Sequence, residues 1–241
     1  IAISLVGFVE DLRGVRAMVR AGLQFLVGAA FALALSLTTG ASLIWLPLAA
    51  LFFAANVNFV NVMDGVNGIS GLNGMVAGLA YAALGAVSSL PWLTVLGALT
   101  AIVFAAFLPW NLTPPGMFLG DVGSYLLGGA LGAIAIAALM SGFNPIEALA
   151  PLTICWADTV STRLGRLRRG EHVFEAHRSH VYQKLTRSGL SHVAVAVMVA
   201  FFTLVASLVG HLVARDALAA PLSLAVLAVI AGAYLGLPVL L

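Results

Sequence analysis

The chain has 241 residues, of which 62% are hydrophobic and only 8% are charged. Its 11 lysines and arginines and 9 aspartates and glutamates give a formal net charge of +2. Because a water-soluble domain carries roughly 25% charged residues, a soluble globule of this composition would expose a large apolar surface. The composition therefore indicates an integral membrane protein and excludes a soluble enzyme, a disordered tail and a nucleic-acid-binding protein. Cys155 is the one cysteine, so no intrachain disulfide and no redox compartment can be inferred.

The first segment, Ile1–Val9, is apolar but too short to cross a membrane. A bilayer core of about 30 Å needs about 20 helical residues. The segment has no basic start and no small-residue cleavage site, so it does not resemble a signal peptide. We interpret it as the end of a spanning helix, and we expect the chain to be a domain that lacks its first helices.

Apolar runs that are broken by Gly, Pro, Asn or charged residues predict further spans. They cover residues 17–37, 43–58, 69–89, 92–110, 123–141, 146–162, 191–213 and 217–238. The predicted fold class is therefore all-α, a polytopic transmembrane helical bundle of about eight full spans plus the end of one more. We expect a single domain over residues 1–241, with a polar loop at residues 163–190.

The distribution of basic residues predicts the orientation of these spans. No Lys or Arg occurs in Ala21–Thr162. The basic residues form three groups, which are Arg13, Arg16 and Arg20, then Arg163 to Arg187, and then Arg215. Alternating loops place the first two groups on one side, which the positive-inside rule identifies as cytoplasmic. On that side the connections begin at Glu10, Asn58, Asn111 and Arg163.

Four acidic residues stand where predicted spans meet inner loops: Glu10, Asp11, Asp64 and Asp121. A charge at membrane depth costs several kcal/mol, so it is a functional hypothesis by default. A single carboxylate could simply mark the point where a helix leaves the lipid, but several that converge on one face favour a shared site. Carboxylate oxygens are the ligands of Mg²⁺, which shares its other positions with waters and phosphates. We therefore expect Mg²⁺, with Mn²⁺ as the alternative, and a phosphate substrate.

Amides and glycines accompany these acids. Asn58, Asn61 and Asn67 surround Asp64 and could orient a ligand or the carboxylate, although ordinary loop polarity would also explain them. Asp121 lies between two glycines just before an apolar run, where it could be a helix N-cap. That position is compatible with function, because a helix N-terminus also favours phosphate oxygens.

The long polar stretch Arg163–Ser188 has two parts. The arginines at its start fit a topological anchor. The cluster from His177 to Gln183 contains Arg178 and His180, and such side chains can bind phosphate or transfer protons. A plain solvated loop is the alternative interpretation of this cluster.

Four strings occur in the order of a known family. They are Gly7-Phe8-Val9-Glu10-Asp11, the segment Asn58 to Gly68 (NFVNVMDGVNG), the segment Phe118 to Ser124 (FLGDVGS), and the segment Ala176 to Gln183 (AHRSHVYQ). This pattern resembles the polyprenyl-phosphate N-acetylhexosamine-1-phosphate transferases of glycosyltransferase family four. The strings cover nearly the whole chain, and together they are a specific signal.

The resemblance implies transfer of a sugar 1-phosphate from a UDP-sugar to a polyprenyl phosphate, with Mg²⁺ and with release of UMP. It implies a multi-pass protein of the bacterial inner membrane whose active site faces the cytoplasm, and membrane lipid and a second copy of the chain as partners. The implied catalytic residues are Glu10, Asp11, Asp64 and His180. The implied metal ligands are Asp121 and Asp11. The implied substrate-binding residues are Asn58, Asn61, Asn67, His177, Arg178 and Phe118, the last stacking against uracil.

The chain departs from the family pattern at several places. Glu10 stands for the first aspartate of a pair, and Asn67 stands where many relatives have an aspartate. The histidine segment resembles the surface-polysaccharide branch. Two other functions are weighed against the transferase. A secondary transporter of an anionic solute would place its charges near the bilayer midplane, and a non-catalytic scaffold of polysaccharide assembly would not depend on a metal.

Overall fold

A computed structural model of the protein describes residues 1–114, 116–171, 179–213 and 220–240. Every regular element in these ranges is a helix, which confirms the predicted all-α fold class. In chain order the elements are α1 (Ala2–Arg13), α2 (Ala17–Thr39), η1 (Leu43–Trp45), α3 (Leu46–Met63), α4 (Ile69–Val87), α5 (Pro91–Leu112), α6 (Gly120–Met140), α7 (Pro145–Leu149), η2 (Ala150–Leu152), α8 (Thr153–Arg168), α9 (Val181–Arg187), α10 (His192–Val213) and α11 (Ala220–Leu240).

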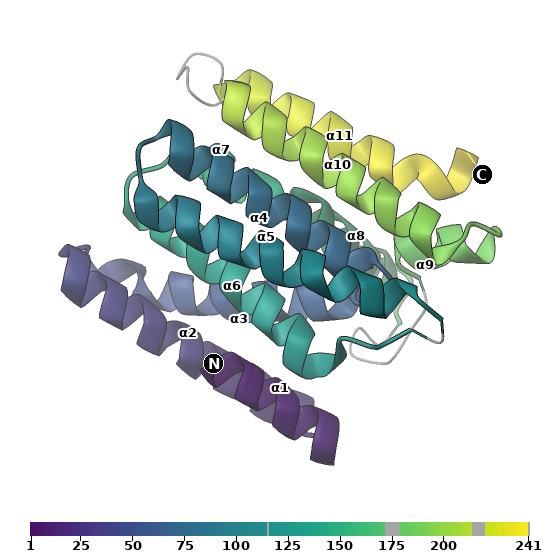
Figure 1. The fold of residues 1–241 in the computed structure, drawn as a ribbon, viewed down its shortest axis with the longest axis horizontal. Coiled ribbons are helices and arrows are strands. Elements are labelled where there is room, and N and C mark those ends of the chain that lie inside the picture. Colours follow the sequence, from purple (N-terminus) through teal and green to yellow (C-terminus); the bar gives the residue numbers. More distant parts are fainter. Residues whose placement is uncertain (115, 172–178, 214–219, 241) are drawn as a thin grey trace.

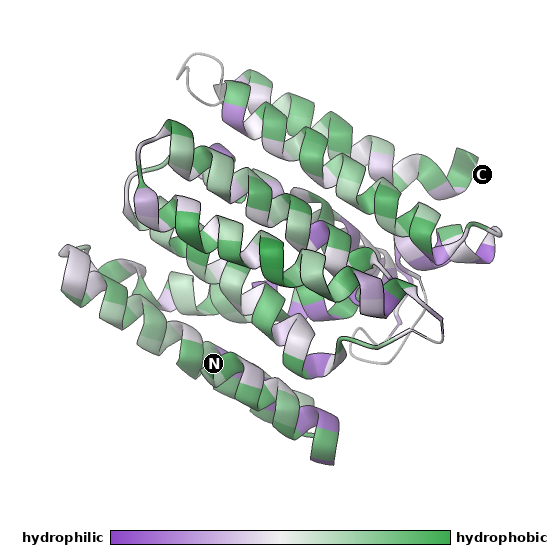
Figure 2. Ribbon diagram, viewed as in Figure 1, coloured by the Kyte–Doolittle hydropathy of each residue, from purple (hydrophilic) through white to green (hydrophobic). Residues whose placement is uncertain are grey.

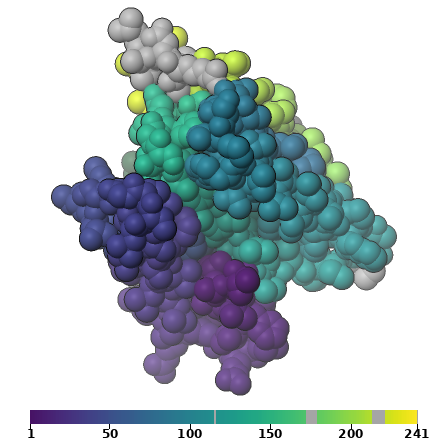
Figure 3. Space-filling view, turned by 60° about the vertical axis from the view of Figure 1, so that its left-hand side comes forward, coloured from purple at the N-terminus to yellow at the C-terminus, as the bar shows by residue number. Residues whose placement is uncertain are grey.

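The long helices lie side by side and successive ones run in opposite directions, so their connections gather at two ends of the bundle (Figure 1). α4 packs most extensively on α5 and α10, whereas α6 packs on α1 and α3. In the space-filling view α1 and α2 lie along one side of the teal body formed by α4 to α6, and the yellow-green C-terminal helices lie on the other side (Figure 3). The element α6 contacts the N-terminal helices α1, α2 and α3 and also α4, α5 and α7.

Among the described residues, 7 helices are long and apolar enough to cross a membrane. They are α2, α3 with η1, α4, α5, α6, α10 and α11. The span expected at residues 146–162 is wrong as a single apolar helix, because this region is divided into α7, η2 and α8. Pro151 lies at the break, where it offers no backbone N–H to the helix. The divided segment nevertheless runs from one end of the bundle to the other (Figure 1).

Two predicted boundaries are also corrected. α3 continues to Met63, so Asn58 and Asn61 lie on a helix and not in a loop. α8 continues to Arg168 and α9 occupies Val181–Arg187, so much of the loop expected at residues 163–190 is helical. The side-chain amides of Asn58 and Asn61 bond to neighbouring helices. These tertiary contacts stabilise the end of α3, where the polar sequence predicted a loop.

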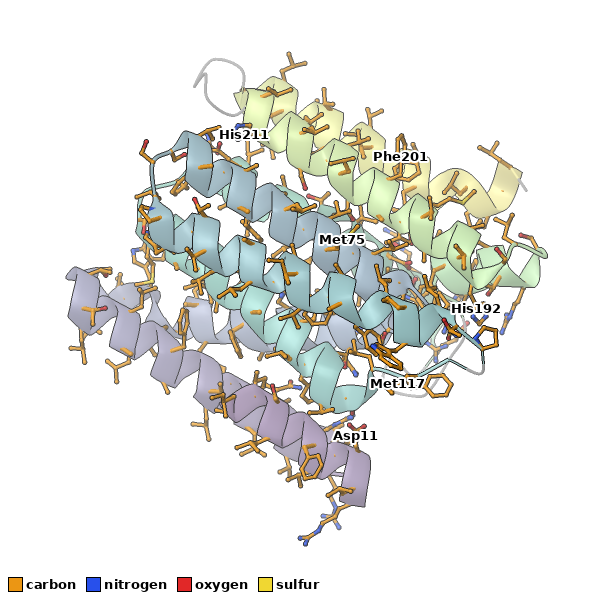
Figure 4. The ribbon with its side chains drawn as sticks, in the orientation of Figure 1. Asp11, Met75, Met117, His192, Phe201 and His211 are labelled. Carbon is orange, nitrogen blue, oxygen red and sulfur yellow. The ribbon has the colours of Figure 1, made fainter. Side chains whose placement is uncertain are left out.

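Among the described residues, most of the charged side chains lie at one end of the bundle, which we call the charged end. It consists of residues 10–20, 64–68, 112–114, 116–121, 163–171 and 179–191. Figure 2 shows hydrophilic colours gathered toward this end, and Figure 4 labels Asp11 there and His211 at the opposite end. The expected convergence of polar loops on one side is therefore confirmed. Arg215 lies outside the described residues.

Glycines bring α4 and α5 into close contact. A Cβ atom on Gly78 would lie 2.5 Å from the backbone nitrogen of Ala101, and one on Gly97 would lie 2.4 Å from that of Ala82. No side chain fits at either position without moving the other helix. Small residues at helix interfaces allow this approach in lipid, where the hydrophobic effect does not drive helices together.

A buried amide joins three helices of the bundle. Asn56 of α3 is fully buried, and its Nδ2 donates to the carbonyl oxygen of Gly128 in α6 at 2.7 Å. Its Oδ1 accepts from the indole Nε1 of Trp156 in α8 at 2.8 Å. Both polar ends of one side chain are thus satisfied away from water, as burial requires.

Asn56→Leu should lower the free energy of unfolding by about 1–2 kcal/mol, because it removes both bonds and leaves the Trp156 N–H without its acceptor. Thermal or denaturant unfolding in detergent would measure the change. Ile102→Leu is the control, since Ile102 is 64% exposed on the outside of α5. Equal stability of the two variants would contradict the structural role of Asn56.

Candidate active site

The ends of three helices meet at the charged end. α1 approaches the start of α6 so closely that a Cβ atom on Gly7 would lie 2.3 Å from the carbonyl oxygen of Asp121. The end of α3 packs on the same helix. This arrangement brings Glu10, Asp11, Asn61, Asp64 and Asp121 together, as the sequence predicted.

The Asp11 carboxylate closes the first turn of α6. Its Oδ1 accepts the backbone N–H of Asp121 at 2.9 Å, and its Oδ2 accepts that of Val122 at 3.0 Å. The first N–H groups of a helix have no partner inside the helix and carry partial positive charge, so a carboxylate is favourable there. Asp11 is therefore an N-cap supplied by another helix, and Asp121 lies in the first turn and not at the cap position. The metal-binding and catalytic roles of Asp11 stay predictions.

Asn61 orients the Asp121 carboxylate. Its Nδ2 donates to Oδ1 of Asp121 at 2.7 Å and lies 3.0 Å from the hydroxyl oxygen of Ser124. Ser124 is fully buried one turn further along α6. The amide thus holds one carboxylate oxygen in place and leaves the other directed elsewhere.

Arg20 is a site residue that the sequence analysis treated only as part of a topological group. Its Nη1 lies 2.8 Å from Oε1 of Glu10 and 3.8 Å from Oδ2 of Asp121. The other oxygen of Glu10 accepts the backbone N–H of Val15. The sequence does contain a signal for this role, because Arg20 lies within the first turns of the apolar helix α2, beyond Arg13 and Arg16. A cation at membrane depth needs a partner.

Asp64 ends α3 and faces the same cluster. The hydroxyl of Ser70 donates to its Oδ1 at 2.6 Å. Burial raises the pKa of Asp64 to about 6, the Ser70 bond opposes this increase, and the charge of Asp121 adds to it. Asp64 and Asp121 are therefore close enough to repel each other, and a bound cation would relieve that repulsion.

The donor set suits a cation that is shared with a substrate. Among the described residues, no three His, Cys, Asp or Glu side chains form a group that could hold a metal ion. Asp11 and Glu10 have their oxygens bonded to backbone N–H groups and Arg20, which leaves Asp64 and Asp121. Mg²⁺ commonly binds one or two carboxylates and completes its shell with waters and phosphate oxygens. These two carboxylates fit that mode and do not form an all-protein cage.

The predicted substrate residues lie at different places. Asn58 donates to Gln24 and to the carbonyl oxygen of Ala54 at 2.8 Å, so its amide is engaged between α2 and α3. Asn67 lies in the turn after Asp64, where its backbone N–H donates to Nδ1 of His192 at 3.4 Å. Phe118 is 83% exposed and free to stack against a planar ligand. His177 and Arg178 lie outside the described residues, and all six binding roles, including that of Asn61, stay predictions.

Asn111 joins the two loops that border the acids. Its Oδ1 accepts the N–H of Gly68, and its Nδ2 donates to the carbonyl oxygen of Met117 at 2.8 Å. Gly68 has a φ of 90°, which favours glycine at this turn. The sequence marked Asn111 only as the start of a loop.

His180 is buried and bonded to a carboxylate that the sequence analysis missed. Its Nδ1 lies 3.1 Å from Oδ1 of Asp158, which is fully buried in α8. Asp158 lies inside the expected span 146–162, and an ionisable residue inside an apolar run is the signal that could have found it. His180 therefore meets the bundle interior and not the acid cluster, and its catalytic role stays a prediction.

Replacing the Asp11 cap should destabilise the protein in a graded way. Asp11→Ala removes both acceptors at the start of α6 and should lower the free energy of unfolding by about 1–2 kcal/mol. Asp11→Asn keeps one oxygen acceptor and should fall between the alanine variant and the native protein. Thermal unfolding in detergent would rank the three, with the exposed Arg13→Gln as control. Three indistinguishable unfolding curves would rule out the cap.

The raised pKa of Asp64 predicts a pH dependence of stability. The folded-state pKa is about 6 and the ordinary value is 3.8, so the folded protein binds the proton more tightly. Stability should then fall as pH rises from about 4 to about 6 and stay lower above that range. Asp64→Asn should lack this component and be more stable than the native protein at neutral pH. Unfolding curves at several pH values would show the difference, and parallel pH profiles of the two proteins would contradict it.

Comparisons with known proteins identify the family of this chain. The family model described as Glycosyl transferase family 4 matches residues 1–139, which include the ends of α1 and α3 and the start of α6. A phospho-N-acetylmuramoyl-pentapeptide-transferase of Clostridium kluyveri is 28% identical over 175 residues, which is 70% of this chain and 52% of the relative. The corresponding protein of Clostridium novyi is 26% identical over 183 residues, covering 73% and 53% of the two chains.

A shorter match is closer in identity. The transferase of the same name from Ruegeria pomeroyi is 47% identical over 60 residues, which is 21% of this chain and 17% of the relative. The chain spans about half the length of the clostridial relatives that it matches. Because the family model covers more than half of the chain, including the helix ends that form the acid cluster, the protein belongs to glycosyl transferase family 4.

Proposed function

We propose that the protein transfers an N-acetylhexosamine 1-phosphate from a UDP-sugar to a polyprenyl phosphate at the charged end of the bundle, and that this end faces the cytoplasm of a bacterium. The observation that carries the proposal is the gathering of four carboxylates at the ends of α1, α3 and α6, two of which, Glu10 and Asp121, lie beside Arg20. Membership of the family and the names of the relatives support the same class of reaction.

The position of the site suits two substrates that do not share a solvent. A UDP-sugar is charged and comes from water, whereas a polyprenyl phosphate is held in the lipid by its hydrocarbon chain. The acid cluster lies where apolar spans end, so both phosphates can reach it. A transporter would instead place its charges near the bilayer midplane, and no observation at the helix ends favours that function here.

In the proposed reaction an oxygen of the acceptor phosphate attacks the sugar-linked phosphorus of the UDP-sugar. A bond forms between them, and the bond from that phosphorus to the bridging oxygen breaks, so the oxygen leaves with UMP. A phosphate monoester has its second pKa near 6, so at neutral pH the acceptor is mostly a dianion and needs little help from a base. The demand on the site is alignment and neutralisation of charge. A covalent intermediate on a carboxylate is the alternative that trapping with UDP-sugar alone would detect.

The residues then divide into two groups. Asp64 and Asp121 would hold Mg²⁺ together with phosphate oxygens, and the ion would neutralise charge on the transferring group. Asn61 fixes the Asp121 carboxylate, and Asp11 and Glu10 hold the start of α6 and Arg20 in place. Phe118 is exposed at the border of the site, where it could stack against the uracil ring. Arg178 is expected to bind phosphate.

The direct test is UMP release from UDP-N-acetylglucosamine by the purified protein in its full natural length, in detergent with undecaprenyl phosphate. Release should require the lipid and Mg²⁺, and Asp121→Asn or Asp64→Asn should lower kcat by at least about a hundredfold, because each removes a charge from the metal site. Glu147→Gln is the matched control, since Glu147 pairs with His211 at the opposite end of the bundle.

Other outcomes would overturn the proposal in recognisable ways. If UMP release continues in the presence of a chelator, the proposed role of Mg²⁺ is wrong. Absence of release with several UDP-sugars from a folded protein would favour a scaffold, and uptake of an anionic solute into vesicles would favour a transporter.

A further inference from the structure

Asp158 is a fully buried carboxylate that holds three elements together. Its Oδ1 lies 3.1 Å from Nδ1 of His180 and accepts the backbone N–H of Val181 at 3.1 Å, at the start of α9. Its Oδ2 accepts the hydroxyl of Tyr234 in α11 at 2.8 Å. Thr162 lies one turn along α8 and donates to Oδ1 at 3.3 Å. Every contact comes from a donor, so the carboxylate is well satisfied.

This contact sets the tautomer of His180. Oδ1 of Asp158 already acts as an acceptor for the backbone N–H of Val181, so the matching tautomer of His180 carries its proton on Nδ1 and donates it to the same oxygen. The His180 side chain is 2% exposed, and the backbone N–H of the same residue donates to Oε1 of Gln183 at 3.2 Å. The start of α9 is thus held by its side chain and by its backbone.

Tyr182 connects this buried contact to the acid cluster. Its ring stacks on the His180 ring with centroids 5.7 Å apart. Its hydroxyl donates to the carbonyl oxygen of Val62 at 2.8 Å, two residues before Asp64. On the other side of Asp64, a Cβ atom on Gly65 would lie 2.3 Å from the same hydroxyl. Tyr182 therefore packs against the turn that carries Asp64, from both sides of that residue in the chain.

A buried carboxylate is a poor way to gain stability, because apolar residues of similar volume often serve as well or better. Its value is that it specifies one arrangement. We propose that Asp158 is a positioning residue of the active site: it holds His180 and the start of α9 so that Tyr182 supports the Asp64 turn. The proposal rests on the function proposed above, since that function makes the Asp64 turn part of the reaction site.

The kinetic test compares the kcat of variants at Asp158 with the kcat of a variant that loses a buried hydrogen bond elsewhere in the bundle. Asp158→Ala should lower kcat by about tenfold to a hundredfold, as a small displacement of an aligned group does. Asp158→Asn keeps an oxygen acceptor toward His180 and should recover most of that loss. The control is Thr203→Val, which removes another buried bond between helices, from Thr203 to Asn73 at 2.7 Å, and should leave kcat within about twofold of native.

A second pair of variants tests the same role without changing a buried carboxylate. Tyr182→Phe removes a hydroxyl that donates to a backbone carbonyl at 2.8 Å, and Tyr81→Phe removes a hydroxyl with the same partner type and distance, to Ala148 in α7. The Tyr182 variant should lower kcat by about tenfold, whereas the Tyr81 variant should lose similar stability with kcat unchanged. If both variants lower kcat equally, or if folded Asp158→Ala turns over at the native rate, the positioning role is overturned.

A measurement that does not depend on catalysis can test the positioning role of Asp158 independently of the proposed transferase function. In protein labelled with ¹⁵N-histidine, with His180 assigned from its loss in His180→Gln, the native His180 should be protonated on Nδ1, and Asp158→Ala should shift it toward the Nε2 tautomer. Hydrogen exchange at Gly65 should become faster in the same variant. Unchanged tautomer and exchange would overturn the positioning role, whereas a native protein that releases no UMP but shows both changes would overturn only the proposed function.

Discussion

The contact between the Asp11 carboxylate and the first turn of α6 determines where the rest of the site lies. It neutralises two N–H groups that the helix cannot satisfy itself, and it joins α1 to α6. Because Gly7 has no side chain, α1 lies close enough to α6 for the Asp11 carboxylate to reach these N–H groups. Because Asp121 is part of that first turn, its position follows directly from this contact, and Asn61 and Arg20 then determine where its two oxygens point.

The charged end shows the conflict between stability and function. The four carboxylates of the cluster outnumber Arg20, which lies beside Glu10 and Asp121, and burial makes ionisation of Asp64 unfavourable. A protein selected only for stability would avoid this arrangement. In the proposed function a cation bound by Asp64 and Asp121 would relieve the repulsion between these carboxylates.

The polar groups inside the bundle serve two different purposes. Asn56 and Thr203 are neutral and buried, and their bonds join helices inside the bundle. Asp158 is an acidic group whose partners all donate to it, and it lies behind the segment that borders the site. A neutral bond suffices to join two helices, whereas a carboxylate also imposes the tautomer of His180 and the start of α9.

The sequence by itself determined the environment, the fold class and the composition of the acid cluster, because hydropathy and the position of charges at span ends follow from local residues. It also marked Asp11, Asn61, Asp64 and Asp121. It missed the break at Pro151 and the helical course of Asn58 and Asn61, since both depend on packing against other helices.

Only the tertiary structure decided which partner each polar side chain has. Asp11 caps a helix that begins 109 residues later in the chain, and Asp158 meets His180 through space, across a stretch of chain that gives no local sign of the contact. In the sequence Arg20 belongs to a basic group that indicates topology, whereas its distances to Glu10 and Asp121 place it in the acid cluster. The local sequence indicates whether a residue is more favourable in the membrane or in water. Pairing between distant segments depends instead on how the helices pack, and no single segment determines that packing.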